Sequence, residues 1–429
     1  MAADPLFRKL VQRLIVPLAV LSFVNAIDRM NISFAGQAMS ADLGLTPATF
    51  GLGISAFFLA YLLFQYPHAL LLRLIGLRWW LLLSVTVWGI AGVWMAHVET
   101  AGQFYAARFL LGTAEAGFAP GVTFVISQWI PVHARARAMA IALSSVPLSL
   151  VLGGPLCGWM LGLDSPLGMA EWRGMFLLQA IPNFALAVAA FFYFVDRPAD
   201  ARWLSDSERQ KLDHLLAGEQ KETAQAPLRW TDAAQDPQVW RCAATWLLVM
   251  TGSYALVFWL PQLVRQLALT DSEFLIGTLS ALPQAALVLG LLVNARHSDR
   301  TGERQWHVGA GAALAGFALL AATLLPVGWP VLGLLTVAGA GLGAAQGVFW
   351  TVPAALGIGS GRVPVGVIAF ISMFGTAGGI VGPLLIGWVR ETFGSFMPAI
   401  AALAALLLLA FFVIVMPFRW RRPQPASGV

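Results

Sequence analysis

Four ionisable side chains lie deep within apolar stretches in the first half of the chain: Asp28, Arg29, Arg108 and Glu115. A charged residue at the centre of a membrane helix costs about 2.5–3.5 kcal/mol on insertion scales, so such residues normally face a cavity or a partner. A carboxylate that is shielded from water holds a proton more readily than one in water. We therefore predict that Asp28 and Glu115 carry protons. The alternative is a pair of structural salt bridges that fix the first span against the fourth.

Spacing limits how these four residues can pair. Asp28 and Arg29 are adjacent and point about 100° apart on a helix, so each must find a different neighbour. Arg108 and Glu115 lie two turns apart on nearly the same face, too far for direct contact but aligned along one path. A guanidinium stays charged in a cavity and offers two parallel donors to a carboxylate. Arg29 is thus the predicted anion-binding residue, with Arg108 as a second contact or as a group that tunes Glu115.

Uncharged polar and aromatic residues are candidates for the same site. Hydroxyls and amides orient a ligand, and an aromatic ring covers its apolar face. For each of them, packing or hydrogen bonding between helices is the competing interpretation. The predicted substrate contacts besides the two arginines are Tyr61, Tyr254, Trp350, Ser372 and Thr376, with Gln284 and Gln346 as further candidates.

The elements that must position these residues are membrane helices. Of the 429 residues, 59% are hydrophobic and 11% are charged, which excludes a soluble multidomain chain. Apolar runs that approach the roughly 20 residues needed to cross a bilayer recur along the sequence, without the alternation of barrel strands. An all-α membrane protein with twelve spans is expected. The predicted spans are 14–37, 50–72, 79–97, 103–128, 138–162, 174–195, 241–264, 274–294, 307–325, 330–355, 363–388 and 396–417.

Charge placement predicts the orientation and the division of the chain. Lysines and arginines gather in the even-numbered connections and at both ends, whereas the opposite side holds Arg173, Arg265 and Arg390. Short cytoplasmic loops collect such residues, so both termini are expected in the cytoplasm. A polar segment at 196–239 separates a first bundle, 1–195, from a second bundle with its tail, 240–429.

An internal repeat relates the two halves. Gly76 with Arg78 recurs as Gly302 with Arg304, and the pair at 154–155, Gly-Pro, recurs at nearly the same offset at 382–383. A parallel repeat is typical of transporters whose halves rock about a site at mid-membrane. The alternative is chance, because glycine and proline are frequent in membrane helices.

Five motifs, in order over nearly the whole chain, resemble the major facilitator superfamily and, within it, the anion:cation symporters that include tartrate, phthalate and sugar-acid permeases. The resemblance implies two pseudo-symmetric six-helix bundles and alternating access. It also implies proton-coupled uptake of a dicarboxylate, hydroxy acid, aromatic carboxylate or sugar acid, with coupling at Asp28 and Glu115. The motifs are Asn25-Ala26-Ile27-Asp28-Arg29, the eleven residues from Arg108 to Phe118, Trp259-Leu260-Pro261, the loop from Ser298 to Arg304, and Gly378 to Pro383.

Three positions depart from the family pattern. Ala26 stands where a tyrosine is common, Ser372 where sugar-acid relatives have an asparagine, and Arg73 where an acid is expected in the loop after the second span. The first two predict a rebuilt substrate pocket. The third predicts that the two gate loops are unequal.

The loop from Ser298 to Arg304 resembles the cytoplasmic gate motif of the superfamily. Asp299 is expected to accept hydrogen bonds from the exposed amides at the start of the eleventh span, where the helix dipole favours negative charge. Arg300 and Arg304 either brace this contact or follow the charge rule for inner loops. Gly302 completes the predicted gate.

The sequence does not predict an enzyme, a cofactor, a metal site or nucleic-acid binding. Its six histidines are scattered without metal-ligand spacing, and its glycines cluster inside apolar spans rather than between a strand and a helix. Cys157 and Cys242 imply no disulfide framework. The expected partners are a small organic anion, protons and the lipid bilayer, for a monomer in a bacterial inner membrane. The alternatives are an anion exchanger or exporter of the same fold and, in another class, a membrane receptor that transports nothing.

Overall fold

The computed structural model describes residues 5–163, 168–222, 234–358 and 365–416. The first span is continuous through α1, a π-helical segment and α2. The helices of the first half are α1 (Pro5–Leu10), the π-helical segment (Val11–Ile15), α2 (Val16–Leu43), α3 (Pro47–Ala96), α4 (Ala101–Glu115), α5 (Phe118–Trp129), α6 (Val132–Leu143), α7 (Ser145–Leu161) and α8 (Glu171–Tyr193).

A short 3₁₀ turn (Pro198–Asp200) and α9 (Asp206–Glu222) connect this half to the second. The helices of the second half are α11 (Pro237–Gln266), α12 (Glu273–Thr301), α13 (Gln305–Ala322), α14 (Trp329–Phe349), α15 (Val352–Ala355), α16 (Val365–Phe393) and α17 (Met397–Val415).

Eleven stretches in the described part of the chain are long and apolar enough to cross a membrane, and one of them is long enough to cross twice. This stretch is α3, in which Gly76 leaves the helical conformation with φ of 79° and ψ of 170°. A side chain there would be strained in φ and would also meet Asp196, whose carboxylate oxygen lies 2.7 Å from the position of a Cβ. The chain folds back at this point, since Trp80 Nε1 donates to His68 Nδ1 across the bend at 3.2 Å, and residues 47–75 and 77–96 are two separate spans. The predicted twelve-helix class is confirmed.

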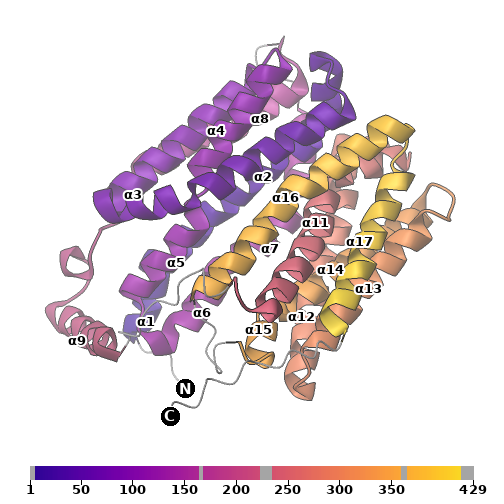
Figure 1. Cartoon of the computed structure of the whole chain (residues 1–429). Coiled ribbons are helices and arrows are strands. Elements are labelled where there is room, and N and C mark those ends of the chain that lie inside the picture. The colour runs from indigo at the N-terminus through magenta and orange to yellow at the C-terminus, as the bar shows by residue number, and fades with distance from the viewer. Residues whose placement is uncertain (1–4, 164–167, 223–233, 359–364, 417–429) are drawn as a thin grey trace.

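Figure 1 shows the helices of the first half, from indigo to magenta, grouped on the left, and those of the second half, from salmon to yellow, on the right. The two groups meet along three helix pairs: α3 packs against α16, α7 against α12, and α2 against α11. The pairing is symmetric, since spans two and five of one half meet spans eleven and eight of the other. This interface brings residues of both halves to the middle of the molecule.

The two halves are closed together at the end where α2 and α7 finish and α3 and α12 begin; we call it the closed end. Gly154 on α7 and Gly277 on α12 approach so closely that a Cβ on either would overlap the carbonyl oxygen of the other. The backbone N–H of Ala48 donates to Glu391 Oε2 at 2.9 Å. Glu391 belongs to α16, so an acid of the second half caps the positive end of α3.

Candidate functional site

The centre of the candidate site is an ion pair between Arg29 on α2 and Glu115, the last residue of α4. Arg29 Nε donates to Glu115 Oε2 at 3.1 Å, and Arg29 Nη2 donates to Asn25 Oδ1 at 3.2 Å. The Glu115 side chain is 0% exposed, whereas that of Arg29 is 21% exposed. A solute can therefore reach the arginine of this pair, but not the carboxylate.

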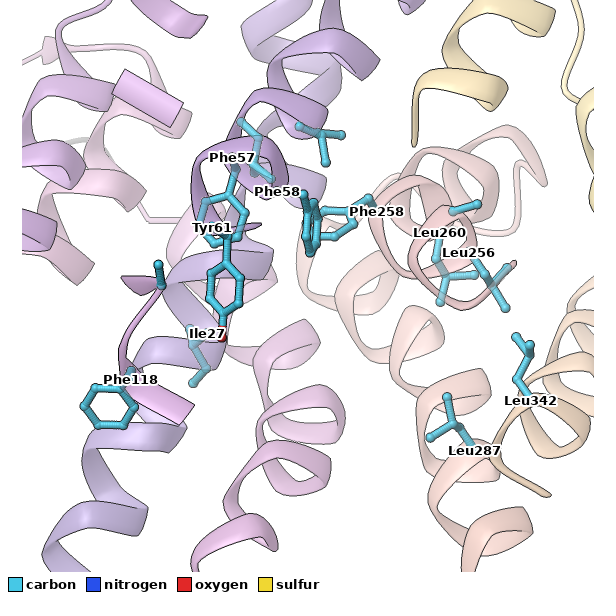
Figure 2. Packing of buried hydrophobic residues seen from close by; sticks show 14 of the residues in the cluster. Ile27, Phe57, Phe58, Tyr61, Phe118, Leu256, Phe258, Leu260, Leu287 and Leu342 are labelled. Carbon is cyan, nitrogen blue, oxygen red and sulfur yellow. The ribbon is translucent and has the colours of Figure 1, made fainter. Parts of the chain in front are cut away.

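Aromatic rings from α3 form one wall of the site. The guanidinium carbon of Arg29 lies 4.8 Å from the ring centre of Tyr61 and 5.3 Å from that of Phe57. The next residue, Phe58, faces the second half, where its ring centre lies 4.6 Å from that of Tyr254 and 5.6 Å from that of Phe258. Figure 2 shows the three α3 rings side by side, with Phe58 turned toward Phe258. Cation–π contacts hold the guanidinium without consuming its hydrogen-bond donors.

Arg108 is fully buried on α4, and its guanidinium carbon lies 4.8 Å from the ring centre of Phe57. None of its three guanidinium nitrogens has a hydrogen-bond partner among the described residues, and neither does Glu115 Oε1. A buried charge without a paired opposite charge is costly. Two arginines thus converge on the ring of Phe57, while the nearby carboxylate pairs with Arg29.

Asp28 has a different environment from its neighbour Arg29, as the 100° spacing predicts. Its Oδ2 accepts a hydrogen bond from Asn183 Nδ2 on α8 at 2.7 Å. One turn further along α2, Asn31 Nδ2 donates to Gln179 Oε1 at 2.7 Å. The two predicted proton carriers therefore lie in separate places: Glu115 of α4 is at the arginine site, and Asp28 of α2 is inside the first bundle.

Of the two bridges that the structural alternative requires between the first and fourth spans, one is present, between Arg29 and Glu115. In place of the second, Asp28 is held by an amide and Arg108 lies on an aromatic ring. A pair of structural salt bridges would give each arginine a carboxylate partner. Here the guanidinium nitrogens of Arg108 have no hydrogen-bond partner among the described residues.

The predicted polar residues of the second half are spread over several helices. Tyr254 contacts the first half through Phe58. Gln346 Nε2 donates to Ser253 Oγ at 3.1 Å, which joins α14 to α11. Thr376 Oγ1 donates to the carbonyl oxygen of Ser372, one turn earlier on α16, at 3.2 Å. Gln284 is buried on α12, and its Oε1 has no partner among the described residues.

The helix before Trp350 ends earlier than the predicted span. The apolar run at 330–355 predicts one long span, but α14 ends at Phe349 and a separate short helix follows. Trp350 is the residue that caps α14, where it is 40% exposed and its ring centre lies 5.3 Å from that of Trp246. The role of Trp350 as a substrate contact stays a prediction.

The predicted gate residues lie at the end of α12 opposite to the closed end. Arg304 Nη1 donates to Asp299 Oδ1 at 2.7 Å and to Ser298 Oγ at 2.9 Å. Gly302 ends α12 in the left-handed conformation, and Arg300 is exposed in the last turn. The expected contact of Asp299 with the start of the eleventh span involves positions 363–364, which lie outside the described residues.

Glu303 caps the start of α13 beside this loop. It accepts hydrogen bonds from the backbone N–H of Trp306 at 2.8 Å and of His307 at 3.1 Å, and its Oε2 lies 2.8 Å from His307 Nδ1. Partial burial acts to raise the pKa of Glu303, but these hydrogen bonds together lower it below its ordinary value.

Sequence reasoning missed the buried amides around Asp28: Asn31, Gln179 and Asn183. Each is an uncharged polar residue inside an apolar run, and a search restricted to ionisable residues passes over it. Asn25 was part of a motif without a predicted role, and it holds Arg29. Among the described residues, no group of three or more His, Cys, Asp or Glu side chains could hold a metal ion.

Comparisons with known proteins agree with this geometry. The sequence pattern of the Major Facilitator Superfamily matches residues 18–364. A putative tartrate transporter of Agrobacterium vitis is 37% identical, over 98% of this chain and 96% of its own length. The putative metabolite transport protein NicT of Pseudomonas putida is 32% identical, over 96% of this chain and 94% of its own length.

A solved structure shows the same fold. It is that of a bacterial homolog of the human lysosomal transporter Spinster, in an inward-facing and occupied conformation. It matches with a TM-score of 0.76 and 18% identity, over 97% of this chain and 96% of its own. Fold and sequence thus agree with the resemblance seen in the motifs. The chain belongs to the Major Facilitator Superfamily and is a multi-pass membrane transporter, not an enzyme.

Proposed function

We propose that the protein takes up an organic carboxylate together with protons, and that Glu115 and the substrate compete for Arg29. The observation that carries this proposal is the ion pair at 3.1 Å, in which the arginine is partly exposed and the carboxylate is fully buried. An anion that enters the site meets a cation whose Nε already donates to Glu115 and whose Nη2 already donates to Asn25. Binding therefore requires the release of Glu115 from Arg29.

Protonation of Glu115 supplies this release. A neutral carboxyl group attracts a guanidinium much less than a carboxylate does, so the Arg29 fork becomes free for bidentate bonds to the substrate. When the anion leaves, Arg29 attracts Glu115 again and the proton departs. Proton and anion then bind with positive cooperativity, which by linkage works equally in both directions.

Two cations favour a substrate with two acidic groups. Arg29 and Arg108 both lie within 5.3 Å of the Phe57 ring centre, and Arg108 has no hydrogen-bonded partner among the described residues. A dicarboxylate or hydroxy diacid would satisfy both guanidinium groups. The name of the tartrate relative points to the same class. Tyr61, Tyr254, Ser372 and Thr376 would orient the remainder of the molecule.

The same proposal includes the orientation in a bacterial inner membrane. Basic residues gather at the end opposite to the closed end, so that end would face the cytoplasm, together with both termini. The closed end would then face outward, so that the site opens toward the cytoplasm, and the protein would act as a monomer. Bundles at 1–195 and 240–429, joined by the linker 196–239, would rock about the site between them, with Asp299, Arg300, Gly302 and Arg304 at the inner gate.

The test is uptake of labelled tartrate into liposomes that contain the purified protein, with an imposed pH gradient. The wild type is expected to accumulate tartrate when the outside is acidic. Glu115→Gln should lose accumulation but still exchange labelled for unlabelled tartrate, because Arg29 is permanently released. Glu99→Gln, at an exposed carboxylate, is the matched control and should behave as the wild type.

Gradient-driven accumulation that survives in Glu115→Gln would contradict the proposal. Flux that needs an opposing anion and ignores pH would instead identify the exchanger of the same fold. Binding of tartrate without any flux would identify the receptor.

A further inference from the structure

A small cavity lies beside Asp28, inside the first bundle and on a different face of α2 from Arg29. Its volume is about 10 Å³, and it is lined by residues of α2, α3, α4 and α8, among them Asn31, Trp88 and Asn183. This volume is about the minimum that holds a single water molecule. The cavity is separate from the anion site described above.

Three polar atoms of residues that line this cavity are buried without a hydrogen-bond partner among the described residues: Asn31 Oδ1, Asn183 Oδ1 and Trp88 Nε1. The orientation of both amides is fixed, because Asn31 Nδ2 donates to Gln179 and Asn183 Nδ2 donates to Asp28. Buried polar atoms without partners are rare in native proteins. Three of them around one cavity point to a ligand.

The chemistry of the three atoms selects the ligand. The two amide oxygens need hydrogen-bond donors, and the indole N–H of Trp88, which points toward the Asp28 carboxylate without reaching ordinary hydrogen-bond geometry, needs a nearer acceptor. Water supplies two donors and an acceptor within this volume. A metal cation would satisfy the oxygens, but it would face the positive end of the indole N–H bond.

The amide side chains near the cavity lie on the side that leads toward the closed end. Asn31 follows Asp28 by one turn on α2, and Gln179 precedes Asn183 by one turn on α8. Both steps lead toward the closed end, where the indole N–H of Trp172 on α8 donates to Asp42 Oδ2 on α2 at 2.7 Å. The polar groups around Asp28 thus extend toward the closed end, within one bundle.

We propose that this cavity binds one water molecule, which passes the transported proton to Asp28 without entering the anion site. The bound water accepts a proton that arrives from the closed end while one of its own O–H protons passes to the Asp28 carboxylate, so the water stays neutral. Release of the proton reverses this exchange. The proton role rests on the proposed function, whereas the water site itself does not.

Hydroxyl-radical labelling by X-ray pulses tests the water site, because ionised bound water labels the side chains next to it. Met95 lines the cavity and is 0% exposed, so it should be labelled in the wild type. Met39, equally buried on α2, is the control and should stay unlabelled. Asn31→Leu should abolish the Met95 label, and Asn31→Ser, which keeps a polar group, should retain it. An unlabelled Met95 in the wild type overturns the site.

Tartrate transport tests the proton role in the same variants. Asn31→Leu should reduce pH-driven accumulation at least tenfold and leave tartrate exchange unchanged, while Asn31→Ser should accumulate tartrate as the wild type does. Full accumulation by Asn31→Leu overturns the role, and so does an equal loss of accumulation and exchange in both variants. Tartrate accumulation that is driven by a sodium gradient would show that the cavity binds a cation instead of water, and would also overturn the proposal. A wild type without pH-driven accumulation defeats the proposed function, and the labelling still decides the site.

Discussion

The two halves of the transporter share one helical plan but bury different chemistry. Among the described residues, the buried charged side chains are Asp28, Arg108 and Glu115, all in the first half. The buried polar side chains of the second half carry no charge; they are Thr245, Thr251, Ser253, Gln262, Ser280, Gln284 and Ser298. Under the proposed function this difference is a division of labour: the first half would couple anion and proton, and the second would orient the substrate and close over it.

The energies of hydrogen bonds predict how strongly substitutions in each half should reduce transport. A hydrogen bond to a charged group contributes about 1.5–3 kcal/mol, and a neutral one about 0.5–1.5 kcal/mol. Substitutions at the charged site of the first half should therefore reduce transport more than substitutions at polar residues of the second half.

The largest effect is expected from Arg29→Gln. It removes the anion-binding cation and leaves Glu115 buried without its partner, a loss of about 2–5 kcal/mol in comparable buried pairs. Tartrate uptake, measured as kcat/KM in liposomes, should fall at least about thirtyfold. Arg29→Lys keeps the charge but not the bidentate fork, so kcat/KM for tartrate should fall less in this variant, by about tenfold. A KM near that of the wild type in Arg29→Gln would show that the anion binds elsewhere.

The second effect concerns the contact between the halves. In Gly154→Ala the new Cβ would overlap the carbonyl oxygen of Gly277, so the closed end should fail to close. Uptake should drop strongly while tartrate binding to the detergent-solubilised protein persists. The matched control is Gly333→Ala on α14, where a Cβ meets nothing within 4 Å. Equal uptake by the two variants would show that this approach of α7 and α12 is not needed for transport.

A smaller effect is expected from Thr376→Val in the second half. It removes one neutral hydroxyl, so KM for tartrate should rise about twofold to tenfold. The ratio of accumulation with and without the pH gradient should stay that of the wild type. If Thr376→Val abolishes the response to pH, the division of labour between the halves is wrong.

The smallest effect lies at Glu303, outside the membrane-spanning segments. Its pKa is lowered in the folded state, so its contribution to stability is present above the ordinary carboxyl pKa and is lost as the pH falls through the folded value. Glu303→Gln should therefore unfold at a lower temperature than the wild type near neutral pH. The difference in unfolding temperature between the two proteins should shrink below about pH 4. A gap that widens in acid would reverse the sign and contradict the hydrogen-bonded arrangement.

Residue type and depth were enough to predict the fold class and the burial of Asp28, Arg108 and Glu115. Twelve apolar runs predict twelve spans, because the backbone N–H and C=O groups of such a run can all be hydrogen-bonded inside a bilayer when it forms a helix. Adjacent positions also predicted that Asp28 and Arg29 face different partners, as the structure shows. These inferences need only helix geometry and the cost of burying charge.

The choice of partners could not be predicted in the same way. That Glu115 pairs with Arg29 depends on how α2 and α4 are aligned along their axes, and this alignment follows from packing against other helices. Asn183 and Asn31 escaped notice because an amide in an apolar run serves packing as often as chemistry. The predicted span at 330–355 was too long because hydrophobicity continues past the end of α14.

The most direct test of competition between Glu115 and the anion for Arg29 is the number of protons taken up when tartrate binds. Isothermal titration calorimetry in two buffers of different ionisation enthalpy measures this number near neutral pH. The wild type should take up protons on binding, and Glu115→Gln should take up about one fewer per tartrate bound. Equal proton uptake by the two proteins, or none by the wild type, would contradict the mechanism.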